Sequence, residues 1–365
     1  MARTAAILLS RQPLRPYGST PWVANTVAAI RWLKDQDVVL CSSVGMQTWE
    51  LVTAVASMER IPLRLYLPSS LTNANNGQVA IFRNYALDGQ PAEFCQVEES
   101  ARATKEDILM RRDEAVVHAA DILIPISIRP GGHMAALLES ARATGKEIVK
   151  DFEVSKPSRK PMLTYHLDSA ALNPDIDSVA GQYLIHWTRT SNSAWQDERL
   201  IDYYAAIVRS EAYPRSALDT LRHIVSSRRI IASARHMPEN IPTVALSSLP
   251  PREVIPLMRW RTRYSEMSFE PYGIGIRTDF AARLNIRPAV YYEGKNTPPE
   301  ASATPWLCQS IGSKTDWRQE QEYRHKGDLL LDGLPKDALC LFCRFPEEAL
   351  QLERDLGIKA ISLQT

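Results

Sequence analysis

The chain has few cysteines, no long apolar run and almost no net charge. Its five cysteines are too few and too scattered for a disulfide framework. Cys340 and Cys343 lie in the apolar run ALCLFCRF without a second pair of ligands, which favours buried strand cysteines over a metal or redox site. No apolar stretch approaches the roughly 20 residues of a membrane span, and the run in MARTAAILLSRQP is too short for a signal peptide. We therefore expect a soluble, cytoplasmic protein that does not enter a membrane.

Charge and length narrow the possibilities further. The 43 Lys and Arg residues offset 42 Asp and Glu, so the net charge of +1 gives no overall attraction to nucleic acid or anionic membranes. At about 150 residues per domain, a chain of 365 residues predicts two domains. Residues 151–180 are rich in Pro, Ser and charge without a regular period, as is typical of a linker. We place a first domain at 1–152, a linker at 153–180 and a second domain at 181–365, and the oligomeric state stays open.

The first domain alternates short apolar runs with segments of helical periodicity. The runs TAAILLS, DVVLCSS, PLRLYLP, ADILIPIS and KEIVKDF predict buried strands. Between them, segments such as TPWVANTVAAIRWLKD and QTWELVTAVASMER carry apolar residues at helical spacing. This order predicts an α/β Rossmann-like domain, in which helices cover both faces of a parallel sheet.

Three of these predicted strands end in residues that suit a nucleotide. In an open α/β sheet, ligands bind at the carboxyl ends of the strands, where helix N-termini offer free N–H groups to phosphate. Glycines let the backbone approach a ligand closely, although they are also typical of plain turns. The candidate nucleotide-binding residues are Ser10, Arg11, Ser43, Gly45, Arg129, Gly131 and Gly132.

The loop after the third of these strand ends resembles a known motif. PGGHMAALLE, residues 130–139, is similar to the P-G-G-x-G-T-x-x-E motif of the SLOG superfamily, which includes the LOG nucleotide hydrolases and DprA. The Pro-Gly-Gly is kept, but Met134 and Ala135 replace the Gly-Thr, and Glu139 comes one position late. The resemblance implies nucleotide binding by residues 1–150, and its departures argue against hydrolysis there.

The second half of the chain follows a different pattern. Short strands are predicted at GQYLIHWTRT, IPTVALSSLPP, PYGIGIRTDF, RPAVYYEG, DWRQEQEYRH and LCLFCRF, and a helix at SALDTLRHIVSSRRI. Several strands with few helices predict an α+β domain rather than a second Rossmann-like one. If residues 316–325, DWRQEQEYRH, form a strand, alternation places Glu320 and Glu322 on one face.

The order of motifs in this half resembles the ADP-ribosyltransferase fold, with most similarity to DarT-like and abortive-infection toxin families. The matching motifs are H-x-T at 186–188, an A-L-x-x-I-L-like helix at 217–225, S-x-x-P at 247–250, Y-G-I-G-I at 272–276 and W-x-x-E-x-E-[WY]-R at 317–324. The last of these is the most specific, and together the motifs cover about residues 180–345. The resemblance implies that the second domain uses NAD as its substrate.

The resemblance also implies roles for individual residues. A carboxylate that holds the nicotinamide ribose and faces the developing oxocarbenium charge stabilises the transition state, and this role falls to Glu322, with Glu320 on the acceptor side. Sequence alone does not decide which of the two carboxylates is essential, and the pair also fits an ion-pair ladder on a solvated face. The third catalytic candidate is His186, which would hold the adenosine ribose or a phosphate. The expected NAD-binding residues are His186, Thr188, Ser247, Ser248, Tyr272 and Arg228.

Two basic clusters are the strongest local positive charge in the chain. The first, RRIIASARH, holds Arg228, Arg229, Arg235 and His236, and the second, RWRTRY, holds Arg259, Trp260, Arg261, Arg263 and Tyr264. Such clusters suit the pyrophosphate of NAD or a nucleic-acid acceptor. They equally suit an exposed surface that nearby acids balance.

These inferences predict an NAD-dependent ADP-ribosyltransferase or NAD glycohydrolase joined to a nucleotide-sensing domain, as in bacterial anti-phage defence or toxin systems. The acceptor would be a nucleic acid or a protein. Two alternatives stay open. One is a nucleotide N-glycosidase in the first domain, which would depend on Arg129 or Glu139. The other is a non-catalytic nucleic-acid-binding protein that uses Arg259, Arg261 and Arg263.

Overall fold

The chain forms two compact units that each take residues from two separate stretches. The computed structural model describes residues 2–69, 77–99, 102–157, 162–235, 237–262, 265–293, 298, 303–311 and 317–365. The first unit comprises Met1–Pro161 and Asn192–Pro214, and the second comprises Met162–Ser191 and Arg215–Thr365. This division differs from the expected one of 1–152, 153–180 and 181–365, because residues 192–214 return to the first unit.

The first unit is an α/β domain with a six-stranded parallel sheet in the order β4-β3-β2-β1-β5-β6. Its strands are β1 (Arg3–Leu9), β2 (Val38–Ser42), β3 (Leu63–Pro68), β4 (Ala92–Val97), β5 (Ile122–Ser127) and β6 (Glu147–Ile148). All residues of β5 and all but the first of β1 are buried, because these central strands are covered on both faces. The Rossmann-like arrangement expected from the sequence is therefore present in this unit.

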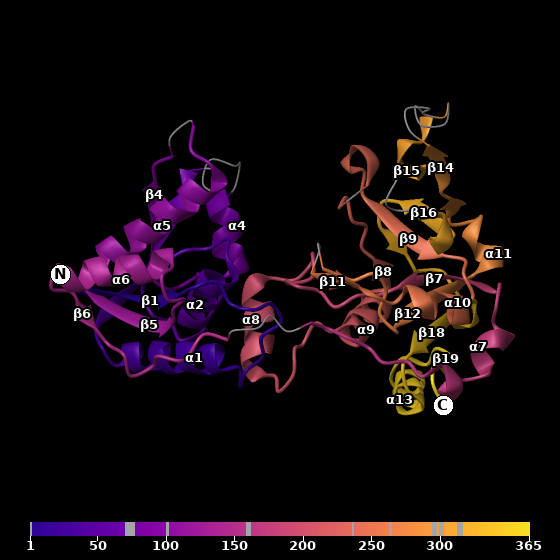
Figure 1. Ribbon diagram of the computed structural model, residues 1–365, viewed down its shortest axis with the longest axis horizontal. Coiled ribbons are helices and arrows are strands. Elements are labelled where there is room, and N and C mark those ends of the chain that lie inside the picture. The colour runs from indigo at the N-terminus through magenta and orange to yellow at the C-terminus, as the bar shows by residue number, and fades with distance from the viewer. Residues whose placement is uncertain are drawn as a thin grey trace. The chain divides into compact units, whose positions relative to one another are not determined.

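Helices cover both faces of this sheet (Figure 1). They are α1 (Pro21–Lys34), α2 (Gln47–Met58), α4 (Gly77–Asn84), α5 (Lys105–Ala119) and α6 (His133–Ala143). Helices α1 and α2 pack against the sheet in one apolar cluster, and α5 and α6 pack against it in the cluster on the other face. Helix α5 begins at a capping box in which Thr104 and Asp107 each accept a hydrogen bond from the other's backbone N–H group.

The strand order reverses between β1 and β5. From β1 the chain adds β2, β3 and β4 on one side, and it then returns to place β5 and β6 on the other side. At such a reversal, the loops that follow the two strands lead away from each other. Ligands of open α/β sheets bind between these two loops. The loop after β1 and the loop after β5 therefore flank the position at which a ligand of this unit is expected.

Helix α8 (Leu200–Arg209) joins the first unit although it follows the first strand of the second unit in the chain. Its warmer colour marks it beside α2 in Figure 1. Tyr203, Tyr204 and Ile207 lie on one helical face and are buried in the same cluster as α1 and α2. The hydroxyl of Tyr204 donates a hydrogen bond of 2.8 Å to the carboxylate of Glu50 on α2.

The second unit is an α+β domain with a seven-stranded sheet in the order β13-β16-β9-β7-β12-β18-β19. Its strands are β7 (Tyr183–Trp187), β9 (Thr243–Ser247), β12 (Gly273–Arg277), β13 (Arg287–Pro288), β16 (Glu322–Lys326), β18 (Leu339–Cys343) and β19 (Ala360–Ser362). All neighbouring strands are antiparallel except β18 and β19. Cys340 and Cys343 are both fully buried in β18, where they pack as apolar side chains.

Smaller elements surround this sheet. Two longer helices, α9 (Ala217–Ser227) and α13 (Pro346–Leu356), pack on one face of it. Three short helices are α7 (Asp175–Ser178), α10 (Pro251–Val254) and α11 (Thr278–Ala281). Three two-stranded pairs are β8 (Arg229–Ile230) with β17 (Leu329–Leu330), β10 (Trp260–Arg261) with β11 (Glu266–Met267), and β14 (Val290–Glu293) with β15 (Cys308–Ile311). In the part of the chain that the structure describes, no helix is long and apolar enough to cross a membrane.

The large sheet opens between β7 and β9. Every residue of β7 pairs with β12, whereas among the described residues β7 and β9 share a single registered pair, Ile185 with Ser247. Adjacent strands diverge wherever pairing stops after one residue, so their backbone groups need other partners there. Strand β9, on one side of this opening, pairs at its other edge with β16, which carries the end of the W-x-x-E-x-E motif.

Several strand predictions need correction. Residues 316–325 do not form one strand: η5 (Trp317–Glu320) is a 3-10 turn, and β16 begins only at Glu322. Strand β6 is shorter than KEIVKDF, and β4, with half-exposed and polar residues, was not predicted at all. His236, Arg263 and Tyr264, from the two basic clusters, lie outside the described residues.

The burial of α8 predicts that this helix stabilises the first unit. Ile207 is 0% exposed, so we expect Ile207→Ala to lower the free energy of unfolding of this unit by about 2–5 kcal/mol. Hydrogen exchange measured by mass spectrometry should show lost protection in peptides from α1 and α2. Arg209→Ala, at an exposed position of the same helix, is the matched control. Equal exchange in both variants would contradict the packing of α8 described above.

Candidate functional site

Three neighbouring strands carry candidate site residues that were expected from the sequence motifs. Ser247 on β9 lies directly opposite Glu322 on β16 and, on its other side, opposite Ile185 on β7. Residues directly opposite one another share a face of the sheet, so Ser247 and Glu322 project together. His186 follows Ile185 and starts from the other face, at the edge where β7 and β9 part.

The imidazole of His186 spans the opening between β7 and β9. Its Nδ1 lies 2.8 Å from the carbonyl oxygen of Ala245 on β9. A carbonyl oxygen only accepts, so Nδ1 carries the hydrogen and the neutral ring presents Nε2 as an acceptor. Burial lowers the pKa of His186, and the charge of Arg189 lowers it further, while the bond to Ala245 opposes both. The neutral ring can therefore accept a hydrogen bond from a ligand hydroxyl.

The turn that carries Glu320 is fixed by the serines of β9. The hydroxyl of Ser247 donates to the carbonyl of Glu320 at 2.6 Å, and the N–H of Ser248 donates to the carbonyl of Gln321 at 3.1 Å. Gln321 has a φ of 43°, in the left-handed region, which turns the chain sharply between the two glutamates. The two carboxylates are therefore not alternate residues of one strand, as the sequence suggested, but come from a turn and from the strand that follows it.

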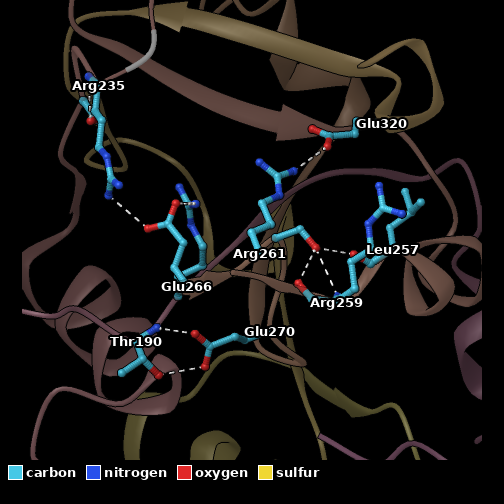
Figure 2. A network of polar contacts seen from close by, with 11 residues as sticks. Thr190, Arg235, Leu257, Arg259, Arg261, Glu266, Glu270 and Glu320 are labelled. Carbon is cyan, nitrogen blue, oxygen red and sulfur yellow. Dashed lines mark hydrogen bonds and ion pairs between the residues drawn. The ribbon is translucent and has the colours of Figure 1, made fainter. Parts of the chain in front are cut away.

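The carboxylate of Glu320 contacts an arginine of the β10–β11 hairpin. Nη2 of Arg261 donates to Oε1 of Glu320 at 3.1 Å, and both side chains are about one-fifth exposed (Figure 2). Burial raises the pKa of Glu320, and the nearby Glu322 raises it further, whereas Arg261 and Arg189 lower it. This carboxyl group is thus better able to take up a proton than an exposed glutamate.

Glu322 is held by a buried arginine two residues along the same strand. Nε and Nη2 of Arg324 each donate to one oxygen of Glu322 at 2.9 Å. Arg324 is 1% exposed, and its guanidinium also donates to the carbonyl of Trp306 and to Oε1 of Gln309. A bidentate arginine fixes the plane of a carboxylate while leaving lone pairs on both oxygens for a further donor. Glu322 is therefore fixed in place and still able to accept a hydrogen bond.

Arg189 was not selected from the sequence, although it directly follows the H-x-T motif. Its guanidinium pairs with Glu266 at 3.3 Å. Arg235 pairs with the other oxygen of Glu266 at 3.0 Å, as Figure 2 shows. The positive charge of Arg189 lowers the pKa of both His186 and Glu320. This arginine supplies positive charge to the site that the motif search overlooked.

The chain just beyond Arg189 is firmly anchored. Glu270 is 1% exposed, and its oxygens accept from the N–H and the hydroxyl of Thr190, both at 2.7 Å. Tyr165 donates a third hydrogen bond to the same carboxylate. A buried carboxylate with three donors is well satisfied, so it holds the end of β7 in place.

Three of the expected NAD-binding residues serve the fold instead. The hydroxyl of Thr188 donates to the carbonyl of Ala217 at 2.8 Å, and Thr188 is 1% exposed. The hydroxyl of Tyr272 donates to Glu348 on α13 at 2.9 Å. The guanidinium of Arg228 donates to the carbonyls of Leu331 and Leu334. These contacts join strands and helices of the second unit, and they leave His186, Ser247, Ser248, Glu320 and Glu322 as the candidate site.

In the first unit, most of the expected nucleotide-binding residues meet at the β1 and β5 ends. The backbone N–H of Arg129 donates to the hydroxyl of Ser10 at 2.8 Å, which ties the two loops together. Gly131 has a φ of 66°, and Gly132 caps α6 without any side-chain cap. Lys156 donates to the carbonyl of Arg11, so this edge carries the side chains of Arg11, Arg129 and Lys156. Positive charge beside an uncapped helix N-terminus suits an anion.

The third loop of this unit is engaged internally. The hydroxyl of Ser43 donates to the carbonyl of Tyr66 at 2.7 Å, and Ser43 is fully buried. Gly45 has a φ of 83°, and its backbone donates to the carboxylate of Glu50. A donor that serves Glu50 is not available to a phosphate, so the loop after β2 contributes less than the sequence predicted.

The lowered pKa of His186 predicts a pH-dependent stability. Since the folded value lies below the ordinary value of 6.5, the unfolded chain takes up the proton first, and stability falls as the pH drops below about 6.5. The measurement is the free energy of unfolding in urea at about pH 7.5 and at about pH 5.5. Between these two pH values, we expect this free energy to fall by about 1 kcal/mol more in the wild type than in His186→Gln. An equal loss in both proteins would show that His186 is not the group responsible.

The comparisons with known proteins give little further guidance. No protein-family model matches the chain. No curated protein matches it either. Among solved structures, the X-ray structure of DNA processing protein A (DprA) from Streptococcus pneumoniae is similar over 40% of this chain, with 11% identity and a TM-score of 0.30. The chain covers 49% of that protein's length, about half. This likeness is too low to carry an argument, so the Rossmann-like description of the first unit depends on its own sheet order and helices.

Proposed function

We propose that the second unit cleaves NAD and either transfers its ADP-ribose group or hydrolyses it. The observation that carries this proposal is the placement of His186, Ser247 and Glu322 on the adjoining strands β7, β9 and β16, at the point where the sheet opens. Those are the residues that the resemblance to ADP-ribosyltransferases selects for binding and chemistry. The strand order therefore puts Ser247 and Glu322 on one face, with His186 on the next strand starting from the other face at the opening.

The chemistry of NAD cleavage explains the two carboxylates. As the bond from the ribose to nicotinamide loosens, positive charge develops on the ribose, and a fixed carboxylate stabilises that charge more than the ground state. Glu322 is fixed by the fork of Arg324 and is assigned this role. Burial raises the pKa of Glu320. We therefore assign to Glu320 the role of taking the proton that the acceptor gives up.

His186 and Arg189 complete the proposed NAD site. The Nε2 atom of His186 would accept a hydrogen bond from a ribose hydroxyl, since its Nδ1 is engaged by Ala245. The guanidinium of Arg189 is about half exposed and would face the pyrophosphate. Ser247 positions the Glu320 turn rather than binding NAD, because its hydroxyl donates a hydrogen bond to the carbonyl of Glu320.

Loss of the Glu322 carboxylate should strongly reduce the release of nicotinamide from NAD. We expect Glu322→Gln to lower release from NAD by about a hundredfold or more, because the amide carries no charge to face the transition state. Glu320→Gln should retain more of the release, since its role lies with the acceptor. Glu114→Gln, on the exposed face of α5, is the control.

Release should be followed by chromatography of the reaction products, with and without nucleic acid or cell lysate as a source of acceptors. Circular dichroism confirms that each variant is folded. A wild-type protein that releases no nicotinamide under any of these conditions would contradict the proposal.

For the first unit we propose a nucleotide or nucleotide-derived ligand bound between the loops after β1 and β5. The support is the group of Arg11, Arg129 and Lys156 beside the N-terminus of α6. A ligand-binding unit joined to an NAD-consuming unit has the organisation of a sensor with an effector. By that analogy we place the protein in bacterial defence or toxin systems.

Removing positive charge at this edge should weaken binding to the first unit. We expect Arg129→Ala to lower the affinity for a nucleotide by roughly tenfold, as charge-assisted hydrogen bonds contribute about 1.5–3 kcal/mol. Calorimetric titration of wild type with a panel of adenine and guanine nucleotides identifies the ligand, and the variant is then compared. Arg142→Ala, exposed in the last turn of α6, is the matched control. Equal weakening by both variants would argue against this site.

A further inference from the structure

The β10–β11 hairpin places an arginine of the protein itself against the proposed acceptor-side carboxylate. Figure 2 shows the guanidinium of Arg261 pointing to Glu320, with Nη2 at 3.1 Å from Oε1. Arg261 lies on β10, and Glu320 lies 59 residues later in the turn before β16. This contact is therefore a product of the fold and not of local sequence.

The surroundings of Arg261 suit a reacting group. Its side chain is 23% exposed and that of Glu320 is 22% exposed, so both remain accessible to solvent and substrate. Glu322 follows Glu320 by two residues, and its charge is felt at Glu320. The guanidinium of Arg261 thus lies beside the Glu320 carboxylate of the pair.

The hairpin that carries Arg261 is itself held in place. Its second strand carries Glu266, which pairs with Arg189 and Arg235. Just before the hairpin, the backbone N–H of Arg259 donates to the hydroxyl of Ser268 at 3.1 Å. These contacts restrict the motion of the hairpin. Holding Arg261 against Glu320 therefore costs little additional conformational entropy.

We propose that Arg261 is an acceptor of ADP-ribose, so that the protein modifies its own hairpin. This inference rests on the proposed cleavage of NAD by the second unit. It names the class of acceptor, an arginine side chain, and one position at which transfer occurs.

The transfer balances in atoms and charge. The bond between the ribose anomeric carbon and the nicotinamide nitrogen breaks, and nicotinamide leaves with the electron pair as a neutral molecule. A terminal nitrogen of Arg261 forms the new bond to that carbon and gives up one proton, which Glu320 accepts and passes to solvent. The product guanidinium keeps its positive charge. Glu320 is suited to take the proton, because burial raises its pKa.

The test follows nicotinamide release and self-labelling in one reaction. The full-length protein is incubated with NAD that carries a label on its adenine, and the labelled peptides are mapped by mass spectrometry. We expect the label on Arg261 in the wild type. In Arg261→Lys, which keeps a cation against Glu320, the label incorporated per nicotinamide released should fall at least about tenfold. Arg354→Lys, at an exposed position of α13 in the same unit, should leave that ratio unchanged.

The possible outcomes are distinct. If nicotinamide is released but Arg261 carries no label, NAD cleavage stands and self-modification at this position is overturned. If no nicotinamide is released by the wild type, the proposed function fails, and the inference fails with it. The wild-type peptide map decides the first question without reference to any variant, so a misfolded variant cannot obscure it.

Discussion

A sheet that opens between two strands leaves backbone groups that need new partners, and the second unit supplies them from side chains. His186 donates to the carbonyl of Ala245, and Ser247 donates to the carbonyl of Glu320. Each of these bonds satisfies the backbone and at the same time orients a group of the candidate site. The bond across the opening between β7 and β9 therefore decides the tautomer of His186, and Ser247 holds the turn that carries Glu320 on the other side of β9.

The chain crosses from the second unit to the first shortly after β7. After β7 the chain passes Thr190, leaves the second unit, forms α8 in the first unit and returns at Arg215. The two crossing points are joined, because the N–H of Ser191 donates to the carbonyl of Arg215 at 3.0 Å. Helix α8 contacts Glu50 beside the Gly45 loop of the first unit.

Sequence patterns predicted the parts of this structure that depend on local chemistry. Apolar runs predicted β1, β2, β3 and β5. The motifs that hold His186, Ser247 and Glu322 lie on the neighbouring strands β7, β9 and β16. Patterns could not assign α8, because an amphipathic helix with Tyr203, Tyr204 and Ile207 on one face suits either core. Nor could they show that η5 precedes β16, because the turn depends on Gln321 in a left-handed conformation and on Ser247 across the sheet. Nor could they show that the hydroxyls of Thr188 and Tyr272 bond within the fold, because a hydroxyl that binds a ligand and one that joins two elements look alike in sequence.

The two glutamates differ in environment more than in position. Glu322 faces a guanidinium fork at both oxygens and is 12% exposed, whereas Glu320 meets Arg261 through one oxygen and has its pKa raised by burial. Carboxylates in unlike environments take unlike roles, as acid–base pairs in enzymes show. A carboxylate fixed against a cation is suited to face developing positive charge, and one with a raised pKa is suited to take a proton. The buried Arg324 therefore gives different environments to two glutamates that are only two residues apart, because of the two it pairs with Glu322.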